Sequence, residues 1–410
     1  MPAQPKGFNY DESKVPAYIL PDPLTAEDGS PIDTVEKWET KRRPEILSLF
    51  ETHVYGRRPA VPLDQKSVVT EESSDALGGK AHRKQVTLLF EGGSQPYGLR
   101  LLIYLPKGSS TPAPLFLGYN FNGNHSIHSD RNIHLSPSWM RKNSNGNREH
   151  RATSASRGAS SYRWPVEKII AKGYGIATAY YGDVEPDHAE GWKRGIRSFY
   201  TKDERGDPLE IEDWSAISVW AWGLSRIADY LESDPLINAS QVALLGHSRL
   251  GKTALWAGAN DPRFSIVISN NSGCGGAALS RRAFGETVKR INANFPHWFC
   301  RQFSTYDDNE SALPVDQHQL IALMAPRPTY IASAVEDKWA DPKGEFLSAK
   351  NASPVYSLYG LQGVQASVQP GPNTPVGDFI GYHIRDGKHD VTLYDWEQYL
   401  EFADRHFARH

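Results

Sequence analysis

The sequence predicts an α/β fold in which a mostly parallel central sheet is sandwiched between helices. Short apolar runs without a polar face, such as residues 242–245, recur along the chain and are typical of strands buried on both faces. Segments of helical periodicity alternate with these runs, which is the order of parallel strands joined by crossover helices. In addition, residues 246–252 place a serine at a sharp turn between one strand and the helix that follows it.

The N-terminal region predicts an arm followed by helices. Residues 1–33 are rich in proline and irregular, and we expect them to lie over the rest of the protein. Residues 34–43 predict a helix and residues 44–50 a second one, because proline is well tolerated at the first position of a helix. Gly56 is expected to close this helical region.

The next region predicts the first strands of the sheet. Residues 86–90 and 99–105 favour antiparallel strands, since in the second of them Leu99, Leu101, Ile103 and Leu105 fall at every second position. Residues 115–118 predict a further strand. The long polar stretch 126–163 has no regular pattern, and a loop of this length in a compact domain is usually functional or disordered. We expect it to be an insertion at the rim of a functional site.

The remainder of the chain alternates between helices and strands. We expect helices at 165–171, 214–231, 250–259, 282–290 and 393–407, and strands at 175–180, 242–245, 265–269, 329–334 and 380–384. The most regular of the helices is 214–231, whose apolar residues recur at steps of three and four. Because no repeat or linker divides the chain, residues 34–410 predict a single domain.

Composition argues against several classes of protein. The chain of 410 residues has 45 Lys and Arg against 48 Asp and Glu, a formal net charge of −3, without any block of like charge. We therefore expect neither nucleic acid nor an anionic membrane surface as a partner. No apolar stretch is long enough to span a membrane. The start of the chain lacks the apolar core of a secretory signal, so the protein is either intracellular or has lost its signal.

Neither a metal site nor a cofactor is expected. No Cys-x-x-Cys or His-Glu-x-x-His motif occurs. The spacing of His125, His128 and His134 could hold a metal, but they fall in a polar loop, where unliganded histidines are far commoner. The two cysteines, Cys274 and Cys300, could pair, although two cysteines do not determine the redox compartment.

The turn at Ser248 is the strongest indication of chemistry. Gly246 ends a buried strand and a helix-forming segment begins at Leu250, which is the setting of a nucleophile elbow that raises a serine hydroxyl above the sheet. The match to the common pattern is incomplete, since glycine follows the serine one place later than usual. Alternatively, Ser248 only caps the helix.

A serine nucleophile needs a histidine base and an acid that orients the base. In sheets of this kind both follow the serine, in loops after later strands. The candidate histidines are His297, His318, His383, His389, His406 and His410. Of these, His389 lies in the short loop between the last strand and the last helix, where a base is expected. The loop after strand 329–334 offers the acid: Asp337 is the first choice, Glu336 the second and Asp341 the third.

Several motifs resemble those of the glucuronoyl esterases, carbohydrate esterase family 15. The stretch 246–252 resembles the family pattern G-[C/H]-S-R-x-G-K, which also accounts for the displaced glycine. Other stretches that look like the bacterial branch are 120–125, 180–183, 272–276, 316–318, 339–342 and 382–390. The resemblance runs from about residue 35 to the C-terminus and implies an α/β-hydrolase catalytic domain. It also implies hydrolysis of the ester between (4-O-methyl)glucuronic acid of glucuronoxylan and lignin alcohols.

The resemblance implies roles for individual residues. Ser248 would be the nucleophile and His389 the base, while Arg249 would supply a backbone N–H and a guanidinium to the oxyanion. Lys252, Glu286 and Trp339 match positions that contact the sugar. Without the resemblance, these last three would be interpreted as a solvated helix residue, a surface carboxylate and a packing residue.

The chain departs from the family in two places. Many members carry the acid as Glu just before Ser-Gly, where this chain has Asn270 and Asn271. Asparagine cannot hold the imidazolium charge, so the acid must come from elsewhere, and the family's alternative position matches Asp337. Fungal members join cysteines next to serine and histidine; here His247 and Asp390 stand at those places, and we expect them to share a charge-assisted hydrogen bond.

Two other functions remain open from the sequence. One is an esterase that acts on acetyl or feruloyl esters of xylan. The other is a hydrolase-like module that binds carbohydrate without chemistry, an interpretation that Asn271 keeps open unless Asp337 is in place. A polymeric plant substrate implies a secreted or periplasmic protein, and we expect a monomer.

Overall fold

The computed structural model describes residues 4–59, 63–91, 97–108, 111–142, 146–200, 210 and 213–407. The candidate base His410 lies outside the described residues. The chain packs into two compact units. The first comprises Met1–Arg57, Glu212–Ser218 and Gly246–His410, and the second comprises Arg58–Ile211 and Val219–Leu245. The single domain expected for residues 34–410 stays a prediction.

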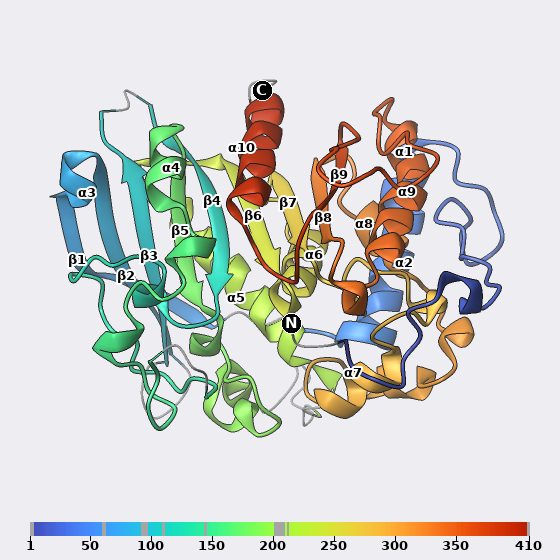
Figure 1. Cartoon of the computed structure of the whole chain (residues 1–410), viewed down its shortest axis with the longest axis horizontal. Helices are drawn as coiled ribbons and strands as arrows, with labels where there is room; N and C mark the ends of the chain where they lie inside the picture. Colours follow the sequence, from blue (N-terminus) through green and yellow to red (C-terminus); the bar gives the residue numbers. More distant parts are fainter. Residues whose placement is uncertain are drawn as a thin grey trace. The chain divides into compact units, whose positions relative to one another are not determined.

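The second unit is built on six strands in the order β1-β2-β3-β5-β4-β6 (Figure 1). Three antiparallel pairs, β1–β2, β2–β3 and β3–β5, are followed by the parallel pairs β5–β4 and β4–β6, which confirms the antiparallel strands predicted before the parallel part. The strands are β1 (Asp64–Asp75), β2 (Ala81–Glu91), β3 (Tyr97–Pro106), β4 (Ala113–Asn120), β5 (Gly175–Tyr180) and β6 (Ile237–His247), the last of which ends in the first unit.

The helices of the second unit are α3 (Ala76–Gly79), α4 (Val166–Ala171) and most of α5 (Ala216–Leu231). Helix α4 packs on β3 and β5. The apolar stripe predicted for α5 is buried in the core, where the Trp220 indole Nε1 donates a hydrogen bond to the Glu185 carbonyl at 2.9 Å.

The first unit contains three parallel strands side by side, β7 (Ile266–Asn270), β8 (Thr329–Ala334) and β9 (Ile380–Arg385) (Figure 1). All their residues are buried, as the apolar runs predict. The helices are α1 (Val35–Lys37), α2 (Arg43–Phe50), α6 (Arg249–Asn260), α7 (Val288–Asn294), α8 (Gln317–Ala322), α9 (Pro342–Leu358) and α10 (Leu393–Phe407). Because the three strands are parallel, the loops that follow them meet at one edge of the sheet.

The N-terminal helices differ from the prediction in their continuity. Instead of separate helices over 34–43 and 44–50, one helical run continues through two π-helical turns to Tyr55. Pro44 occupies the start of α2 without breaking this run. Gly56 ends it as predicted: its φ is 81°, and a Cβ there would collide with the carbonyl of Asp213.

The helix predicted over 282–290 is wrong in its first half. The chain forms a 3-10 turn at Ser280–Arg282, and α7 begins only at Val288 after the Thr287 side chain caps it. Gly285 between them has a φ of +65°, and a Cβ there would lie 2.6 Å from the Lys338 carbonyl. This tertiary contact overrides the helical pattern.

The described parts of the segment 126–163 form only short 3-10 turns and irregular structure, as predicted, and are anchored to the sheet of the second unit. The Asp130 carboxylate pairs with Arg83 of β2, and the Asn132 carbonyl accepts a hydrogen bond from Gln85 Nε2 at 3.0 Å. Its place at the rim of a functional site stays a prediction.

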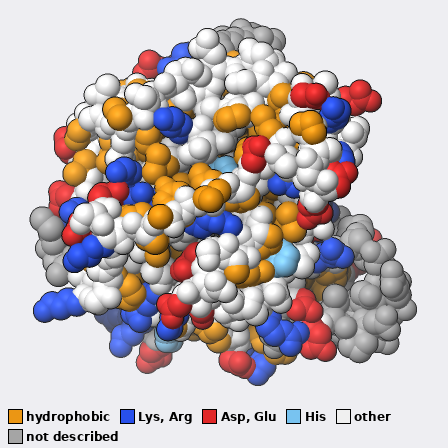
Figure 2. All heavy atoms as spheres, turned by 90° about the vertical axis from the view of Figure 1, so that its right-hand side faces the viewer, with side chains coloured by type: hydrophobic (Ala, Val, Ile, Leu, Met, Phe, Trp, Pro, Cys, Tyr) orange, Lys and Arg blue, Asp and Glu red, His pale blue; other side chains and the backbone are white. Residues whose placement is uncertain are grey.

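Charges on the surface are mixed. Figure 2 shows a face on which Lys and Arg lie interspersed with Asp and Glu, in keeping with the small net charge. In the part of the chain that the structure describes, no helix is long and apolar enough to cross a bilayer.

Candidate active site

Ser248 stands at a strained turn between β6 and α6. Its backbone angles are φ 58° and ψ −128°, a conformation that is costly for a residue with a side chain and is found mainly at functional sites. Gly246 permits the turn, because a Cβ there would collide with the carbonyl of Leu250. The Ser248 side chain makes no capping hydrogen bond to α6, so the alternative that it serves only as a helix cap is wrong.

The loops after β8 and β9 bring an acid and a base together. Asp337 Oδ2 lies 2.6 Å from His389 Nδ1, and the Asp337 residue is only 4% exposed. A carboxylate at Nδ1 selects the tautomer in which the other ring nitrogen, Nε2, can accept a proton. The Asn271 amide donates a hydrogen bond to the same Asp337 oxygen at 2.9 Å and so fixes the orientation of the carboxylate.

Of the three acids considered, only Asp337 hydrogen-bonds to His389 among the described residues. Asp341 instead caps α9 and forms an ion pair with Arg282 at 2.7 Å. Glu336 lines the same cavity as His389 but shares no hydrogen bond with it. The geometry therefore favours the first choice.

Two of the other histidines that could have served as the base are engaged elsewhere. His383 is buried in β9, where its Nε2 lies 3.0 Å from Asp395 and its Nδ1 3.0 Å from the Tyr330 hydroxyl. His318 hydrogen-bonds to the carbonyl of Pro21 at 2.8 Å. These contacts give both imidazoles a structural role.

His247 lies beside the candidate base. Its ring centroid is 4.5 Å from that of His389, and its Nδ1 lies 2.6 Å from Oδ1 of Asn270. The Asn270 Nδ2 donates to the Tyr399 hydroxyl at 2.8 Å, so Oδ1 accepts and His247 Nδ1 carries the proton. The predicted hydrogen bond between His247 and Asp390 stays a prediction.

All seven predicted site residues line one cavity of about 410 Å³ in the first unit. They are Ser248, Arg249, Lys252, Glu286, Asp337, Trp339 and His389. Parallel strands and the turn before α6 thus assemble residues that are far apart in sequence into one cavity.

A buried cation and a carboxyl group both line this cavity and interact electrostatically. Lys252 is 3% exposed, and its ammonium donates to the carbonyl of Ser272. Burial lowers the pKa of Lys252, and the Glu286 carboxylate opposes this shift. Burial likewise raises the pKa of Glu286, and the Lys252 ammonium opposes it. The two groups together offer hydrogen-bond donors and an acceptor to a polar ligand.

Arg249 is held against aromatic rings that the sequence analysis missed. Its guanidinium carbon lies 4.8 Å from the ring centroid of Trp298 and 5.9 Å from that of Phe295. Such contacts stabilise a cation when water is partly excluded. The only signal in the sequence is the cluster of aromatic residues at 295–299. The backbone N–H of Arg249 opens α6, where helix geometry favours an anion.

The N-terminal arm contributes to the same cavity, a contribution that the sequence did not reveal. Gln4 and Pro5 line it, and Gln4 Nε2 donates to the carbonyl of Glu336 at 2.7 Å. Phe8 meets the Trp339 ring edge to face, with centroids 5.0 Å apart. The arm thus supports the loop that carries Trp339.

A buried carboxyl group next to the acid also escaped the sequence analysis. Glu345 of α9 is fully buried. Its Oε1 accepts the backbone N–H of Gly273 at 3.0 Å, and its Oε2 lies 2.6 Å from Ser333 Oγ. Burial, with a smaller contribution from the Asp337 carboxylate, raises the pKa of Glu345 to about 8, although the hydrogen bonds from Gly273 and Ser333 oppose the shift. Glu345 therefore holds its proton at neutral pH.

Glu345 should make the protein less stable as the pH rises. Its carboxyl has a pKa near 4.5 when unfolded and about 8 when folded, so the stabilisation is complete below pH 4.5 and is lost towards pH 8. The loss between pH 5 and pH 8 is of the order of 3–4 kcal/mol. Glu345→Gln mimics the protonated form. Its free energy of unfolding, measured in urea at pH 5 and pH 8, should therefore not show this loss. Glu401→Gln on the surface of α10 is the control, and an unchanged pH slope in Glu345→Gln would contradict the assignment.

The two cysteines and the loop histidines form neither a disulfide nor a metal cluster in the structure. Cys274 and Cys300 are buried free thiols. His125 hydrogen-bonds to Ser156 Oγ at 2.7 Å, and His128 to Glu167 at 2.9 Å. Among the residues for which positions are given, no group of three or more His, Cys, Asp or Glu could hold a metal ion.

Comparison with known proteins gives consistent matches. A family model described as "Glucuronyl esterase, fungi" matches residues 168–360. Carbohydrate esterase MZ0003, from an unknown prokaryotic organism, is 52% identical over 408 residues, which cover 99% of this chain and 94% of that protein. The solved structure of a promiscuous CE15 esterase from a marine bacterial metagenome has a TM-score of 0.92 at 51% identity and covers 98% of this chain and 100% of its own.

A second solved structure, the glucuronoyl esterase from Solibacter usitatus, has a TM-score of 0.91 at 50% identity and covers 96% of this chain and 100% of its own. The resemblance inferred from the motifs is thus confirmed over nearly the whole chain, together with the α/β-hydrolase fold. This chain belongs to the glucuronoyl esterases of carbohydrate esterase family 15.

Proposed function

We propose that this protein is a serine esterase that hydrolyses the ester between (4-O-methyl)glucuronic acid of glucuronoxylan and an alcohol of lignin. The observation that carries the proposal is the 2.6 Å contact between His389 and Asp337 in the cavity that Ser248 lines from its strained turn. Membership of the glucuronoyl esterase family favours this substrate over acetyl and feruloyl esters.

Hydrolysis proceeds by two acyl transfers. Ser248 Oγ attacks the ester carbonyl while His389 Nε2 takes the hydroxyl proton, and Asp337 stabilises the imidazolium. The backbone N–H and guanidinium of Arg249 hold the oxyanion. The bond to the alcohol then breaks, and the alcohol leaves with the proton from His389. A water molecule, deprotonated by the same imidazole, releases the uronate and restores Ser248.

The sugar is held by three further residues that line the same cavity. The Lys252 ammonium donates to ring hydroxyls and the Glu286 carboxylate accepts from them, while Trp339 presents an apolar ring to the C–H face of the sugar. The carboxyl of the substrate is esterified and neutral, so recognition depends on the hydroxyl groups rather than on a charge.

The substrate is tested by comparing esters under one set of conditions. We expect the methyl ester of glucuronic acid to have a higher kcat/KM than acetylated or feruloylated xylan fragments. A higher kcat/KM on acetyl or feruloyl esters would contradict this substrate and would assign the protein an acetyl or feruloyl xylan esterase activity instead. A serine-directed phosphonate should label Ser248, and failure to label it would favour a carbohydrate-binding module without chemistry.

Arg249→Ala should lower kcat on the glucuronate ester by about a hundred- to a thousandfold, the usual cost of one lost oxyanion donor. The guanidinium lies over Trp298 in the cavity that Ser248 lines, so the substitution removes a donor that the fold already holds in place. Arg301→Ala, on the surface of the same unit, should leave kcat unchanged. If Arg249→Ala stays within a few-fold of the wild type, the guanidinium does not hold the oxyanion.

Phe8→Ala should raise KM for the glucuronate ester by roughly two- to tenfold, the range expected from losing one aromatic pair. Phe8 supports Trp339 from the arm without contacting the catalytic groups, so kcat should change little. Ile19→Ala is the control, because Ile19 is 89% exposed. An unchanged KM in Phe8→Ala would show that the arm does not position Trp339.

The location of the protein follows from the proposed substrate, whereas its assembly is a separate proposal. A polymeric substrate outside the cell requires a secreted or periplasmic enzyme, which fractionation of the producing cells would test. We propose a monomer, and light scattering coupled to size exclusion would detect any larger species.

A further inference from the structure

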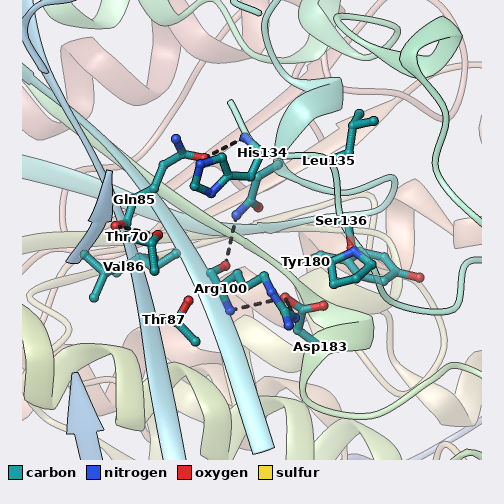
Figure 3. A pocket seen from close by; sticks show the side chains of 13 residues that line it. Thr70, Gln85, Val86, Thr87, Arg100, His134, Leu135, Ser136, Tyr180 and Asp183 are labelled. Atoms are coloured by element: carbon teal, nitrogen blue, oxygen red, sulfur yellow. Dashed lines mark hydrogen bonds and ion pairs between the residues drawn. The ribbon is translucent and has the colours of Figure 1, made fainter. Parts of the chain in front are cut away.

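The second unit contains a cavity of its own, with a volume of about 350 Å³ (Figure 3). Its lining includes Thr87 of β2 and Arg100 of β3, which are paired across the two strands. Asp183, which follows β5, lines it as well, and the segment 134–137 completes it. All these residues belong to the second unit, and the proposed mechanism uses none of them.

The walls of this cavity are fixed by hydrogen bonds. The backbone N–H of His134 donates to Gln85 Oε1 at 2.8 Å, and the Asn124 amide donates to the carbonyl of Arg100 at 2.9 Å. Ser138 Oγ donates to Asp183 Oδ1 at 2.5 Å. The cavity is therefore preformed, as small-molecule sites usually are.

Polar groups without a protein partner line this cavity. Figure 3 shows the Arg100 side chain beside Asp183, with Thr87 close by. The Arg100 guanidinium makes two long contacts through Nη1, at 3.6 Å to Asp183 Oδ2 and at 3.4 Å to the Gly98 carbonyl. Among the described residues, neither the remaining nitrogens of this guanidinium nor the Thr87 hydroxyl has a hydrogen-bond partner. The Arg100 side chain is 37% exposed, so a ligand can reach it.

We propose that this cavity binds one pyranose ring of a neutral saccharide. The opposite charges of Arg100 and Asp183 offset each other, which disfavours a charged ligand. The Asp183 carboxylate is 1% exposed and already accepts from Ser138 Oγ and the Arg100 backbone N–H, so the groups open to a ligand are the guanidinium and the Thr87 hydroxyl. Two neighbouring hydroxyls of a sugar can accept from the guanidinium and pair with the Thr87 hydroxyl, since each hydroxyl both donates and accepts. Leu135, which is 37% exposed, and Pro137 offer an apolar surface to the C–H face of the ring.

The size of the cavity limits the occupant. At about 350 Å³ it is near the lower end of the roughly 300–1,000 Å³ of small-molecule sites, which suits a single ring rather than an oligosaccharide. Two stretches that resemble the family, 120–125 and 180–183, contribute to its lining through Asn124, Tyr180 and Asp183, although the catalytic cavity uses none of these three. The proposal adds a second sugar site that takes no part in bond cleavage.

The test is titration of the full chain with methyl β-xyloside, a neutral pyranoside, followed by NMR, together with a crystal soaked in the same compound. We expect millimolar binding and density for the ring against Arg100 and Thr87. Thr87→Val, which keeps the shape of the side chain, should weaken binding about three- to tenfold, as expected for one hydrogen bond. Arg100→Gln should weaken it at least as much. Thr40→Val, on the first unit, is the control.

Three results would overturn the proposal. The first is absence of binding, the second is equal binding by the wild type, Thr87→Val and Arg100→Gln, and the third is preference of this cavity for glucuronate over the neutral sugar. Thr87→Val replaces one hydroxyl by a methyl group of similar size and should fold normally. The test therefore stays decisive even if Arg100→Gln fails to fold. Binding is measured without turnover, so it can succeed even if the protein fails to hydrolyse glucuronate esters.

Discussion

Ser248→Ala should reduce kcat on the methyl ester of glucuronic acid by about 10⁶-fold, the loss seen when the nucleophile of a serine hydrolase triad is removed. The strained turn holds this hydroxyl in the cavity that His389 also lines. Removing it therefore removes the nucleophile from the site. Binding of the free uronate should persist, because Lys252, Glu286 and Trp339 are untouched.

The measurement is a steady-state assay of purified protein, with thermal unfolding to show that the variant is folded. Ser67→Ala, on the exposed strand β1 of the second unit, is the matched control and should keep wild-type activity. Activity of Ser248→Ala within tenfold of the wild type would show that the reaction does not pass through an ester on this serine.

Asp337→Asn should lower kcat by up to about 10⁴-fold, as loss of the triad acid does in serine proteases. An amide in place of the carboxylate cannot stabilise the imidazolium and can donate to His389 Nδ1, which favours the wrong tautomer. The Asn271 amide now donates to the Asp337 oxygen that contacts His389, so the variant also brings two amides face to face.

Glu336→Gln separates this role from its neighbour. It changes a carboxylate one residue away that lines the same cavity without touching the hydrogen bond to His389, so kcat should fall by no more than a few-fold. Should Glu336→Gln lose as much activity as Asp337→Asn, or Asp337→Asn stay near the wild type, the acid would have to be reassigned.

Much of the fold was predictable because its signals are local. The buried strands β7, β8 and β9 were visible as apolar runs, and α5 and α10 as periodic stretches. Strand β1 was not, since its residues are mostly polar and exposed, and the weakly patterned α9 contains Pro354. In both, the contacts of the folded protein rather than the local sequence decide the conformation.

The sequence by itself determined the turn at Ser248 and the family, and it singled out His389 as the candidate base, because the glycine spacing, the motif around the serine and the position of the last loop are properties of a few adjacent residues. Only the tertiary structure decided which carboxylate supports His389: Asp337 is 52 residues away, and parallel pairing of β8 and β9 places their loops together. The tertiary structure alone also brought Gln4 to Glu336 across 332 residues, and it alone enclosed the cavity around Arg100. Contacts between such distant segments depend on packing, which no local pattern encodes.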